Sequence, residues 1–171
     1  FETEVPEIYE KIVEIKAISR EPGERTKIAV WSKDEKVDPV GACVGVKGAR
    51  VKNIVKELQG EKIDIIRWNP DLVEFVKAAL APAQLEEVNI DEEAKKIQVI
   101  VSDDQLSIAI GKKGQNVRLA CKLVGLDIDV RTRIQLAAEK KLTIRDIKGV
   151  GPKIAKLLEE AGFTEPKQLA N

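Results

Sequence analysis

Apolar and polar residues alternate along the start of the chain, and this pattern predicts a small ladder of strands. Apolar and polar residues alternate roughly over 12–18 (IVEIKAI), as in a half-buried strand. Residues 26–31 predict the returning strand, because the Glu-Pro-Gly-Glu segment at 21–24 between them has the composition of a turn. Asp38 followed by Pro39 then predicts a short helix, with Asp as its cap and Pro at its first position.

Farther along, the apolar spacing changes to that of a helix. Four apolar residues of 51–58 fall on one helical face, and the basic residues lie outside it. The apolar run at 63–66 predicts a strand, and Asn69-Pro70 predicts the start of another helix with one apolar face. The apolar positions of the two helices are Val51, Ile54, Val55 and Leu58, then Leu72, Val73, Val76 and Leu80.

The chain contains an internal repeat. Residues 44–52 and 110–118 share one order: an apolar residue, Gly, two residues, Gly, two residues, Val and a base. The strand predicted at 63–66 is echoed by Ile128 and Val130. Two divergent copies of one small domain explain this similarity better than chance.

The second copy has its own set of predicted elements. Strands are predicted at 88–90 and 97–101, and a short helix at 103–110 that Asp103 caps. A longer helix follows and ends at Gly125. The apolar face predicted for this longer helix consists of Val117, Ala120, Cys121 and Val124.

These elements predict an α+β fold class with two tandem domains and a tail. We place the first domain at residues 1–82, the second at 83–134 and a short helical tail at 135–171. Each domain is predicted to pack helices on one side of a small sheet. Because such short segments are only marginally stable alone, we expect the two copies to pack against each other.

Each copy carries Gly-x-x-Gly between a short helix and a long one. Glycine lets the backbone approach a bulky ligand closely, and the unpaired N–H groups at the start of the long helix favour anions. The pattern therefore predicts a clamp on a sugar-phosphate backbone. One such loop alone indicates only a turn, and exposed charge alone only a solvated surface. Two loops beside acid-free basic stretches, at 46–56 and 111–122, favour the clamp.

Longer motifs around the loops resemble a known family. Residues 38–51 (DPVGACVGVKGARV) with 60–65 (GEKIDI) closely resemble the first KH domain of the NusA family of bacterial transcription factors. Residues 106–120 (LSIAIGKKGQNVRLA) are similar to its second KH domain. The likeness runs from about Val5 to Arg133. It implies two type II KH folds, each holding about four nucleotides, and a role in pausing, termination and antitermination through nascent RNA.

The resemblance also implies a set of site residues. They comprise the two loops, the first turns of the following helices and one strand end; packing is the favoured role of Trp68. The residues expected to contact single-stranded RNA are Gly45, Val46, Lys47, Gly48, Arg50, Lys52 and Arg67, then Gly111, Lys112, Lys113, Gly114, Gln115, Asn116 and Arg118. The family's polymerase-binding domain has no counterpart here, so RNA polymerase and other transcription factors are expected partners of the full-length protein.

Composition excludes several other functions. The net charge is zero, from 29 basic and 29 acidic residues, so local basic stretches would have to attract RNA. Histidine is absent, and Cys43 and Cys121 are predicted as reduced thiols of a cytoplasmic protein, with a disulfide less favoured. We therefore expect no metal, no cofactor and no catalysis.

The apolar runs are short and interrupted by charge, which predicts no membrane helix. We also expect a monomer.

The tail has its own candidate motif. Residues 131–156 are strongly basic, and 147–158 resemble a helix-hairpin-helix. Backbone N–H groups at such a hairpin bind phosphate without reading sequence, whereas a protein-docking appendage is an equal alternative. The residues of this possible phosphate site are Gly149, Val150, Gly151 and Lys153.

Two other functions compete with RNA binding. A nuclease would need clustered carboxylates or a nucleophile with a base, and the Asp103-Asp104 pair has no matching cluster. A KH-fold scaffold that docks on the transcription machinery without binding RNA is the stronger alternative, because the net charge is zero. Lysine inside both loops disfavours it.

Overall fold

The computed structural model describes residues 1–141 and 150–161, which fall into two compact units, Phe1–Arg131 and Thr132–Asn171. The first unit repeats the order helix–strand–strand–helix–helix–strand twice. The first repeat consists of α1 (Pro6–Tyr9), β1 (Val13–Glu21), β2 (Arg25–Ser32), α2 (Pro39–Val44), α3 (Ala49–Glu57) and β3 (Lys62–Arg67). The second consists of α4 (Leu72–Ala79), β4 (Glu87–Asp91), β5 (Lys96–Val101), α5 (Asp103–Ile110), α6 (Gln115–Val124) and β6 (Asp127–Thr132). The predicted α+β class is confirmed.

Each repeat forms a three-stranded sheet. In the first, β2 lies between β1, which is antiparallel to it, and β3, which is parallel. The predicted turn closes the hairpin, where the Glu24 N–H donates to the Glu21 carbonyl over 3.0 Å. The second sheet has the order β4-β5-β6, with β4 antiparallel to β5. The strands predicted from alternation are therefore confirmed.

Helix starts follow the predicted chemistry in one case and differ in two. The Asp38 carboxylate accepts the Gly41 N–H at 3.0 Å and caps α2, as predicted. The cap of α4 is Asp71 rather than Asn69, because Asn69 accepts the Asp71 N–H and turns the chain before the helix begins. Asp103 is the first residue inside α5 and not its cap; Ser102 holds the cap position.

The buried face of α6 differs from the predicted one. Leu119, Ala120 and Leu123 are buried, whereas the other predicted residues, Val117, Cys121 and Val124, are only partly covered. The reason is that α6 packs against its own domain on one side and contacts β1 and β2 of the first domain on the other. Gly125 ends the helix in the left-handed conformation, with φ 81°, as predicted.

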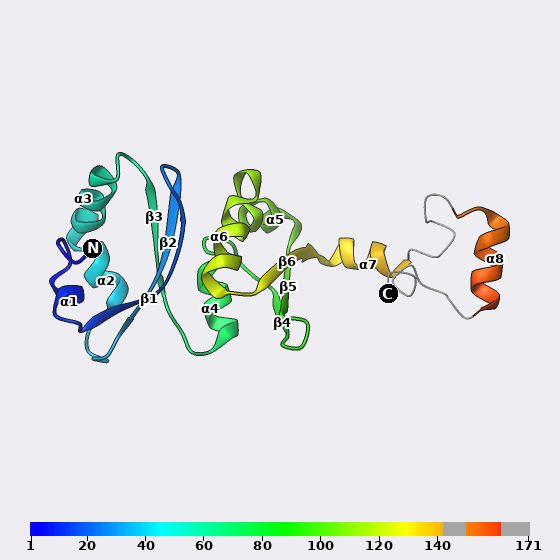
Figure 1. The fold of residues 1–171 in the computed structure, drawn as a ribbon, viewed down its shortest axis with the longest axis horizontal. Helices are drawn as coiled ribbons and strands as arrows, with labels where there is room; N and C mark the ends of the chain where they lie inside the picture. Colours follow the sequence, from blue (N-terminus) through cyan, green and yellow to red (C-terminus); the bar gives the residue numbers. More distant parts are fainter. Residues whose placement is uncertain (142–149, 162–171) are drawn as a thin grey trace. The chain divides into compact units, whose positions relative to one another are not determined.

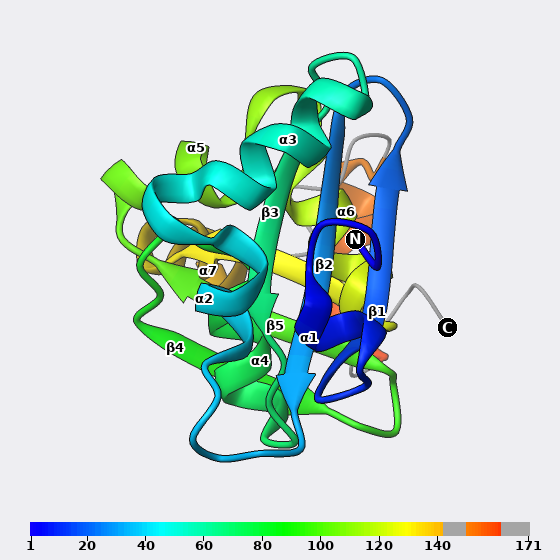
Figure 2. The same ribbon diagram turned by 90° about the vertical axis from the view of Figure 1, so that its left-hand side faces the viewer.

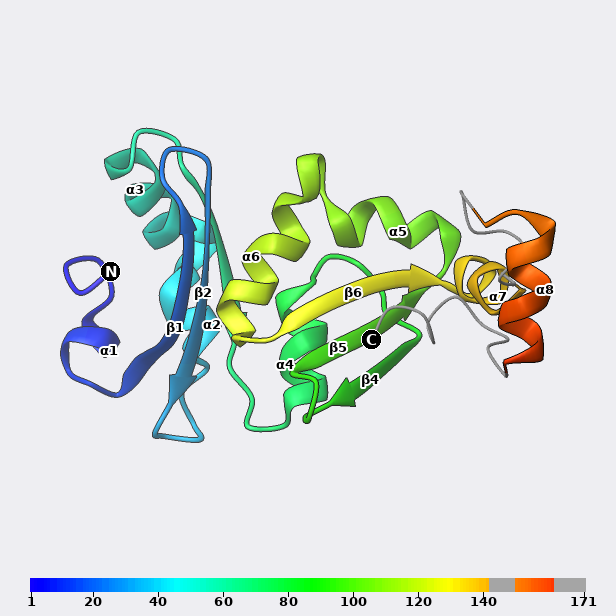
Figure 3. The same ribbon diagram turned by 45° about the vertical axis from the view of Figure 1, so that its right-hand side comes forward.

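The two domains of the first unit share one core. The first sheet has α2 and α3 on one face and α4 and α6 of the second domain on the other (Figures 1 and 3), and Figure 2 looks onto the α2–α3 face. Ile28 and Val30 belong to the cluster beneath α2 and α3. Ala29 and Ile66 belong to a cluster with residues of the second domain. The predicted packing of the copies is confirmed, but the first sheet is covered on both sides.

Charged residues are also buried on the face toward the second domain. Lys27 is fully buried, and its Nζ lies 3.0 Å from Asp64, which also pairs with Arg25 at 2.7 Å. Burial lowers the pKa of Lys27, and Asp64 partly offsets that effect. Alternation alone gave no sign of this cluster, because lysine in a strand ordinarily indicates the solvent side.

The second unit is described in part. Helix α7 (Arg133–Lys141) begins with a reciprocal cap, in which the Thr132 N–H donates to Gln135 Oε1 and the Gln135 N–H donates to Thr132 Oγ1. Helix α8 (Pro152–Glu160) starts at a proline. No helix among the described residues is long and apolar enough to span a membrane.

Both cysteines are free thiols. Cys43 is buried and Cys121 is half-buried. Burial raises the pKa of Cys43 to about 11, with a further contribution from Glu7. Reactivity at Cys43 is therefore suppressed, and the interpretation as separate thiols fits this structure better than a disulfide.

Candidate nucleic-acid interface

The two Gly-x-x-Gly loops have the same backbone conformation. Gly45 and Gly111 have φ/ψ of 74°/173° and 76°/173°. The third residues of the loops, Lys47 and Lys113, both have positive φ, at 52° and 53°. Each loop closes with a hydrogen bond from its last glycine N–H to the carbonyl of its first glycine. The repeat seen in the sequence therefore builds one three-dimensional device twice.

The first glycine of each loop is required by its own neighbours. A Cβ on Gly45 would lie 2.7 Å from Arg50 Cγ, and a Cβ on Gly111 would lie 2.7 Å from Asn116 Cβ and 2.9 Å from its backbone nitrogen. The backbone there also has a conformation that is almost restricted to glycine. The start of the long helix thus packs directly onto the loop, which fixes the loop without any ligand.

Arg50 and Asn116 occupy equivalent positions and brace their loops from behind. Arg50 Nη1 donates to the Ala42 carbonyl at 2.6 Å and pairs with Glu7. Asn116 Nδ2 donates to the carbonyls of Ala109 at 3.0 Å and Leu80 at 3.1 Å. The Ala42 and Ala109 carbonyls lie near the end of the preceding short helix, whereas Leu80 is the C-cap of α4.

Asn116, which was expected to contact RNA, lies inside the fold rather than on the loop surface. Its residue exposure is 4%, and its amide donors point at backbone carbonyls inside the fold. The family resemblance implied this contact, because Asn116 lies in the first turn of the helix after the second loop. The repeat in the sequence already aligns Asn116 with Arg50, but that this position lies behind the loop appears only in three dimensions.

Lys52 and Arg118 form a second equivalent pair. Lys52 Nζ donates to the Lys47 carbonyl at 3.3 Å, and Arg118 Nη1 donates to the Lys113 carbonyl at 3.0 Å. Both side chains are exposed and lie beside the third residue of their loop. They support the loop backbone and place positive charge next to it.

The outer surface of both loops is open. Val46 is 83% exposed, and Lys47, Lys112 and Lys113 are also exposed. Within residues 1–141 and 150–161, no acidic side chain pairs with these three lysines. Each loop therefore presents ammonium groups at the N-terminal end of a helix of 9 or 10 residues, where a phosphate is favoured.

Gln115 and Arg118 connect the second loop to the first domain. Gln115 Nε2 donates to Glu21 at 2.8 Å and Glu24 at 2.7 Å, and Arg118 Nε donates to Glu21 at 2.6 Å. Arg118, and then Gln115, lower the pKa of Glu21 to about 2. These two predicted RNA contacts are engaged in a contact between domains, which we call the hairpin latch (Glu21, Glu24, Gln115, Arg118).

The hairpin that carries the latch is anchored by a buried carboxylate. The side chain of Glu61 is 1% exposed; it accepts two hydrogen bonds from Arg20, at 2.8 and 2.9 Å, one from the Gly23 N–H and one from Thr26 Oγ1. Arg20, and then Thr26, lower the pKa of Glu61 to about 2. Sequence reasoning missed Glu61, because glutamate after a helix-ending glycine ordinarily indicates an exposed turn.

Arg67 and Trp68, at the end of β3, have different surroundings. Arg67 is exposed and pairs with Asp38, so it lies near the start of α2. Trp68 is half-buried, packs against the shared core and meets Trp31 edge to face, with ring centroids 6.5 Å apart. The packing interpretation of Trp68 is confirmed.

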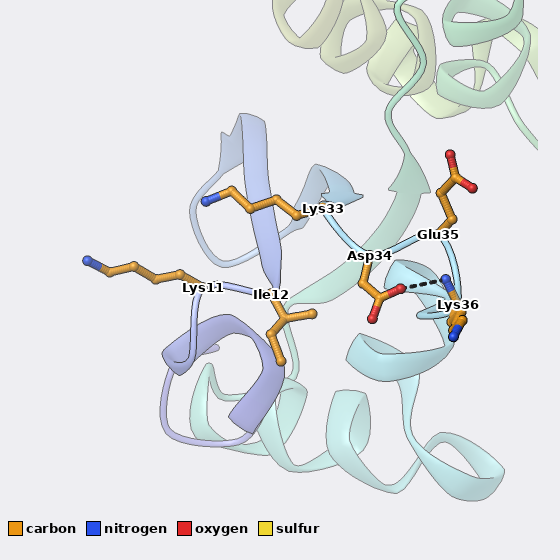
Figure 4. A pocket seen from close by; sticks show the side chains of 6 residues that line it. All are labelled: Lys11, Ile12, Lys33, Asp34, Glu35 and Lys36. Carbon is orange, nitrogen blue, oxygen red and sulfur yellow. Dashed lines mark hydrogen bonds between the residues drawn. The ribbon is translucent and has the colours of Figure 1, made fainter.

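The tail and a hollow in the first domain are two further candidate sites. Of the tail residues, Gly149 lies outside the described residues; Val150 and Gly151 are half-buried before α8, and Lys153 is exposed on it. A hollow of about 520 Å³ lies at the base of the first domain (Figure 4). Lys11 and Lys33 project to one side of it and Lys36 to the other, so its charges do not converge. Among the described residues, no group of three potential ligands could hold a metal.

The fold and the paired loops define a tandem KH-domain protein. Residues 1–68 match the family described as the NusA-like first KH domain, and residues 72–138 match the NusA-like second KH domain. The chain belongs to the NusA-like family. These matches divide the chain ahead of α4, whereas the boundary expected from sequence falls after residue 82.

Individual relatives agree with this assignment. Proteins named transcription termination/antitermination protein NusA are 59% identical in Halalkalibacterium halodurans (77% of this chain, 35% of the relative) and 50% identical in Bacillus subtilis (98% and 43%). The Thermus thermophilus protein of that name is 52% identical (85% and 40%). The solved structure of APE1850 superposes with a TM-score of 0.54 at 28% identity, covering 77% of this chain and 96% of that one. The chain spans less than half the length of these curated relatives.

Proposed function

We propose that this chain binds single-stranded RNA through its two Gly-x-x-Gly loops, as the RNA-binding part of a transcription termination/antitermination factor. The observation that carries the proposal is the repetition of one loop conformation, with exposed lysines, in both KH domains. Relatives named for termination and antitermination support the role in transcription.

Each loop would act as a backbone clamp. The glycines allow the RNA backbone to approach, the N–H groups at the start of α3 or α6 face the phosphates, and the lysines neutralise them. Val46 offers an apolar surface to a base, and Lys52 adds charge beside the first loop. Arg50 and Asn116 would hold the clamps in shape from behind, and Arg67 would meet RNA only by exchanging its Asp38 partner. Gln115 and Arg118 would contact RNA only by leaving the hairpin latch.

The rest of the function follows from the same assignment. We propose RNA polymerase and other transcription factors as partners of the full-length protein, a monomeric state, a cytoplasmic location and no catalysis. The relatives carry names of transcription factors rather than enzymes, which supports the last point. The expected domain limits, 1–82 and 83–134, remain a proposal beside the family matches.

The tail keeps two proposals open. Val150, Gly151 and Lys153, together with Gly149, would hold phosphate at a hairpin. Alternatively α8 would dock a protein, and its exposed Ile154 and Leu157, at 51% and 65%, support this second role.

A titration tests RNA binding directly. A labelled single-stranded RNA and its DNA equivalent are titrated at several salt concentrations with the wild type, Lys47→Asp and the double variant Lys112→Asp/Lys113→Asp. Both variants should weaken RNA binding and flatten the salt slope, by about 0.7 for each phosphate that the variant no longer neutralises.

The control is Lys36→Asp, which makes the same charge change at an exposed residue outside both loops. It should bind as the wild type does, with circular dichroism confirming that every variant is folded. Equal RNA binding by all four proteins, or none by the wild type, would refute the clamp and favour the scaffold alternative.

A further inference from the structure

A polar groove lies where the two KH domains meet. It has a volume of about 700 Å³ and runs between the β1–β2 turn and the loop before α6, which lie beside each other in Figure 3. Its acidic lining residues are Glu21 and Glu24. Its cationic lining residues are Arg20, Lys62, Lys112, Lys113, Arg118 and Lys122.

Ion pairs leave this groove strongly positive. Arg118 is neutralised by Glu21, and Arg20 by the buried Glu61. Four lysines remain, and none of them forms a salt bridge in the described part of the chain, although Lys122 is close enough to Glu21 to help lower the pKa of that carboxylate. They face one further carboxylate, Glu24, which accepts a hydrogen bond from Gln115. A groove with four ammonium groups against one carboxylate favours an anion.

The lysines lie on both walls of the groove and lead away from the second loop. Lys112 and Lys113 belong to the loop itself. Lys122 lies farther along α6, and Lys62 opens β3 on the wall of the first domain, where its N–H donates to the Glu24 carbonyl. The groove thus continues the charged surface of the second loop onto the first domain.

We infer that this groove holds the phosphate backbone of an RNA strand passing between the two loops, with Lys62 and Lys122 as phosphate contacts. The inference rests on the proposed function and adds two contacts outside the Gly-x-x-Gly loops. A polyanionic strand is the occupant that the charges favour, because ammonium groups on two walls suit successive phosphates without reading bases. The second Gly-x-x-Gly loop, which forms one end of the groove, would already hold that strand.

The test compares two RNA lengths. Lys62→Gln and Lys122→Gln are titrated with an RNA of about 5 nucleotides, which fills one loop, and one of about 15, which can cross between loops. The matched control is Lys36→Gln, because Lys36 lies beyond the far end of β2, about 25 Å from the hairpin turn. All three lysines are exposed.

For the long RNA, each groove variant should lower the affinity about fivefold at 0.1 M salt and reduce the salt slope by about 0.7, whereas the control should do neither. The short RNA should bind all proteins alike. The same weakening with single-stranded DNA would support a phosphate contact that does not require the 2′-hydroxyl.

Two outcomes would overturn the inference while leaving the clamps intact. In one, the groove variants bind the long RNA as the control does, although Lys47→Asp binds it weakly. In the other, the groove variants weaken the short RNA as much as the long one, so that the two lysines act only as general attraction. The proposed function fails separately, when the wild type binds neither RNA.

Discussion

The residue five positions after the first glycine performs the same task in both domains with different chemistry. Arg50 reaches its carbonyl with a long guanidinium and takes Glu7 as a counter-ion, whereas Asn116 is short, neutral and buried. A buried site next to the second domain's core admits an amide more readily than a charge. The equivalent position therefore holds a charged side chain where a counter-ion is available and a neutral one where the site is buried.

The buried amide of Asn116 should be sensitive to loss of its donors. Asn116→Asp removes both hydrogen bonds and turns a carboxylate toward carbonyl oxygens, so we expect a loss of about 2–3 kcal/mol or more in the free energy of unfolding. Urea denaturation measures it. Asn89→Asp, exposed on β4, is the control and should change the free energy by less than about 0.5 kcal/mol. Equal losses in the free energy of unfolding for the two variants would show that the hydrogen bonds of Asn116 do not stabilise the fold.

The two glycines of one loop should differ in their tolerance of alanine. Gly114→Ala meets nothing closer than 3.8 Å and incurs only left-handed strain, about 1–2 kcal/mol. Gly111→Ala adds a clash with the backbone of Asn116 at 2.9 Å and should destabilise the protein by more. The free energies of unfolding of the two variants test this order, and a larger loss for Gly114→Ala would contradict the described packing.

At the scale of elements, the β1–β2 hairpin connects the first domain to the second clamp. Glu61 fixes the hairpin from inside, and the hairpin in turn holds Gln115 and Arg118 at the start of α6. The second loop is therefore oriented by the first domain as well as by its own helices. Two carboxylates with lowered pKa values mark the two ends of this connection.

These carboxylates predict how stability depends on pH. The pKa values of Glu21 and Glu61 fall from 4.5 to about 2 in the folded protein, so their contribution is complete above about 4.5 and is lost as the pH falls toward 2. The urea midpoint of the wild type should decline across this window. Glu61→Gln should lower the midpoint near neutral pH and make the decline shallower. Parallel curves for the two proteins would show that Glu61 does not carry the effect.

At the scale of the whole molecule, the sequence predicted the repeated order of elements, because alternation, caps and glycines are local signals. It did not predict which face of α6 is buried, since that depends on the first sheet lying against it. For the same reason the inward position of Asn116, the contacts of Gln115 with the first domain and the burial of Glu61 were not predicted: their partners are far away in sequence. The loops themselves were located correctly, whereas the contacts that hold them in place required the fold.

The central claim is that one RNA strand engages both loops. The most direct measurement is the affinity for RNAs of increasing length, with the wild type, Lys47→Asp, Lys112→Asp/Lys113→Asp and all three changes combined. In the wild type, affinity should rise by about 100-fold or more once the strand is long enough for both loops, because the second contact becomes intramolecular.

Changing either loop should remove that rise, so that a long strand binds with about the affinity of a short one. The combined variant should then bind long strands more weakly only by as much as it weakens the binding of short strands. The contrary result is an affinity that does not depend on length, or a rise that persists when either loop is changed; either would show that the two loops do not hold one strand.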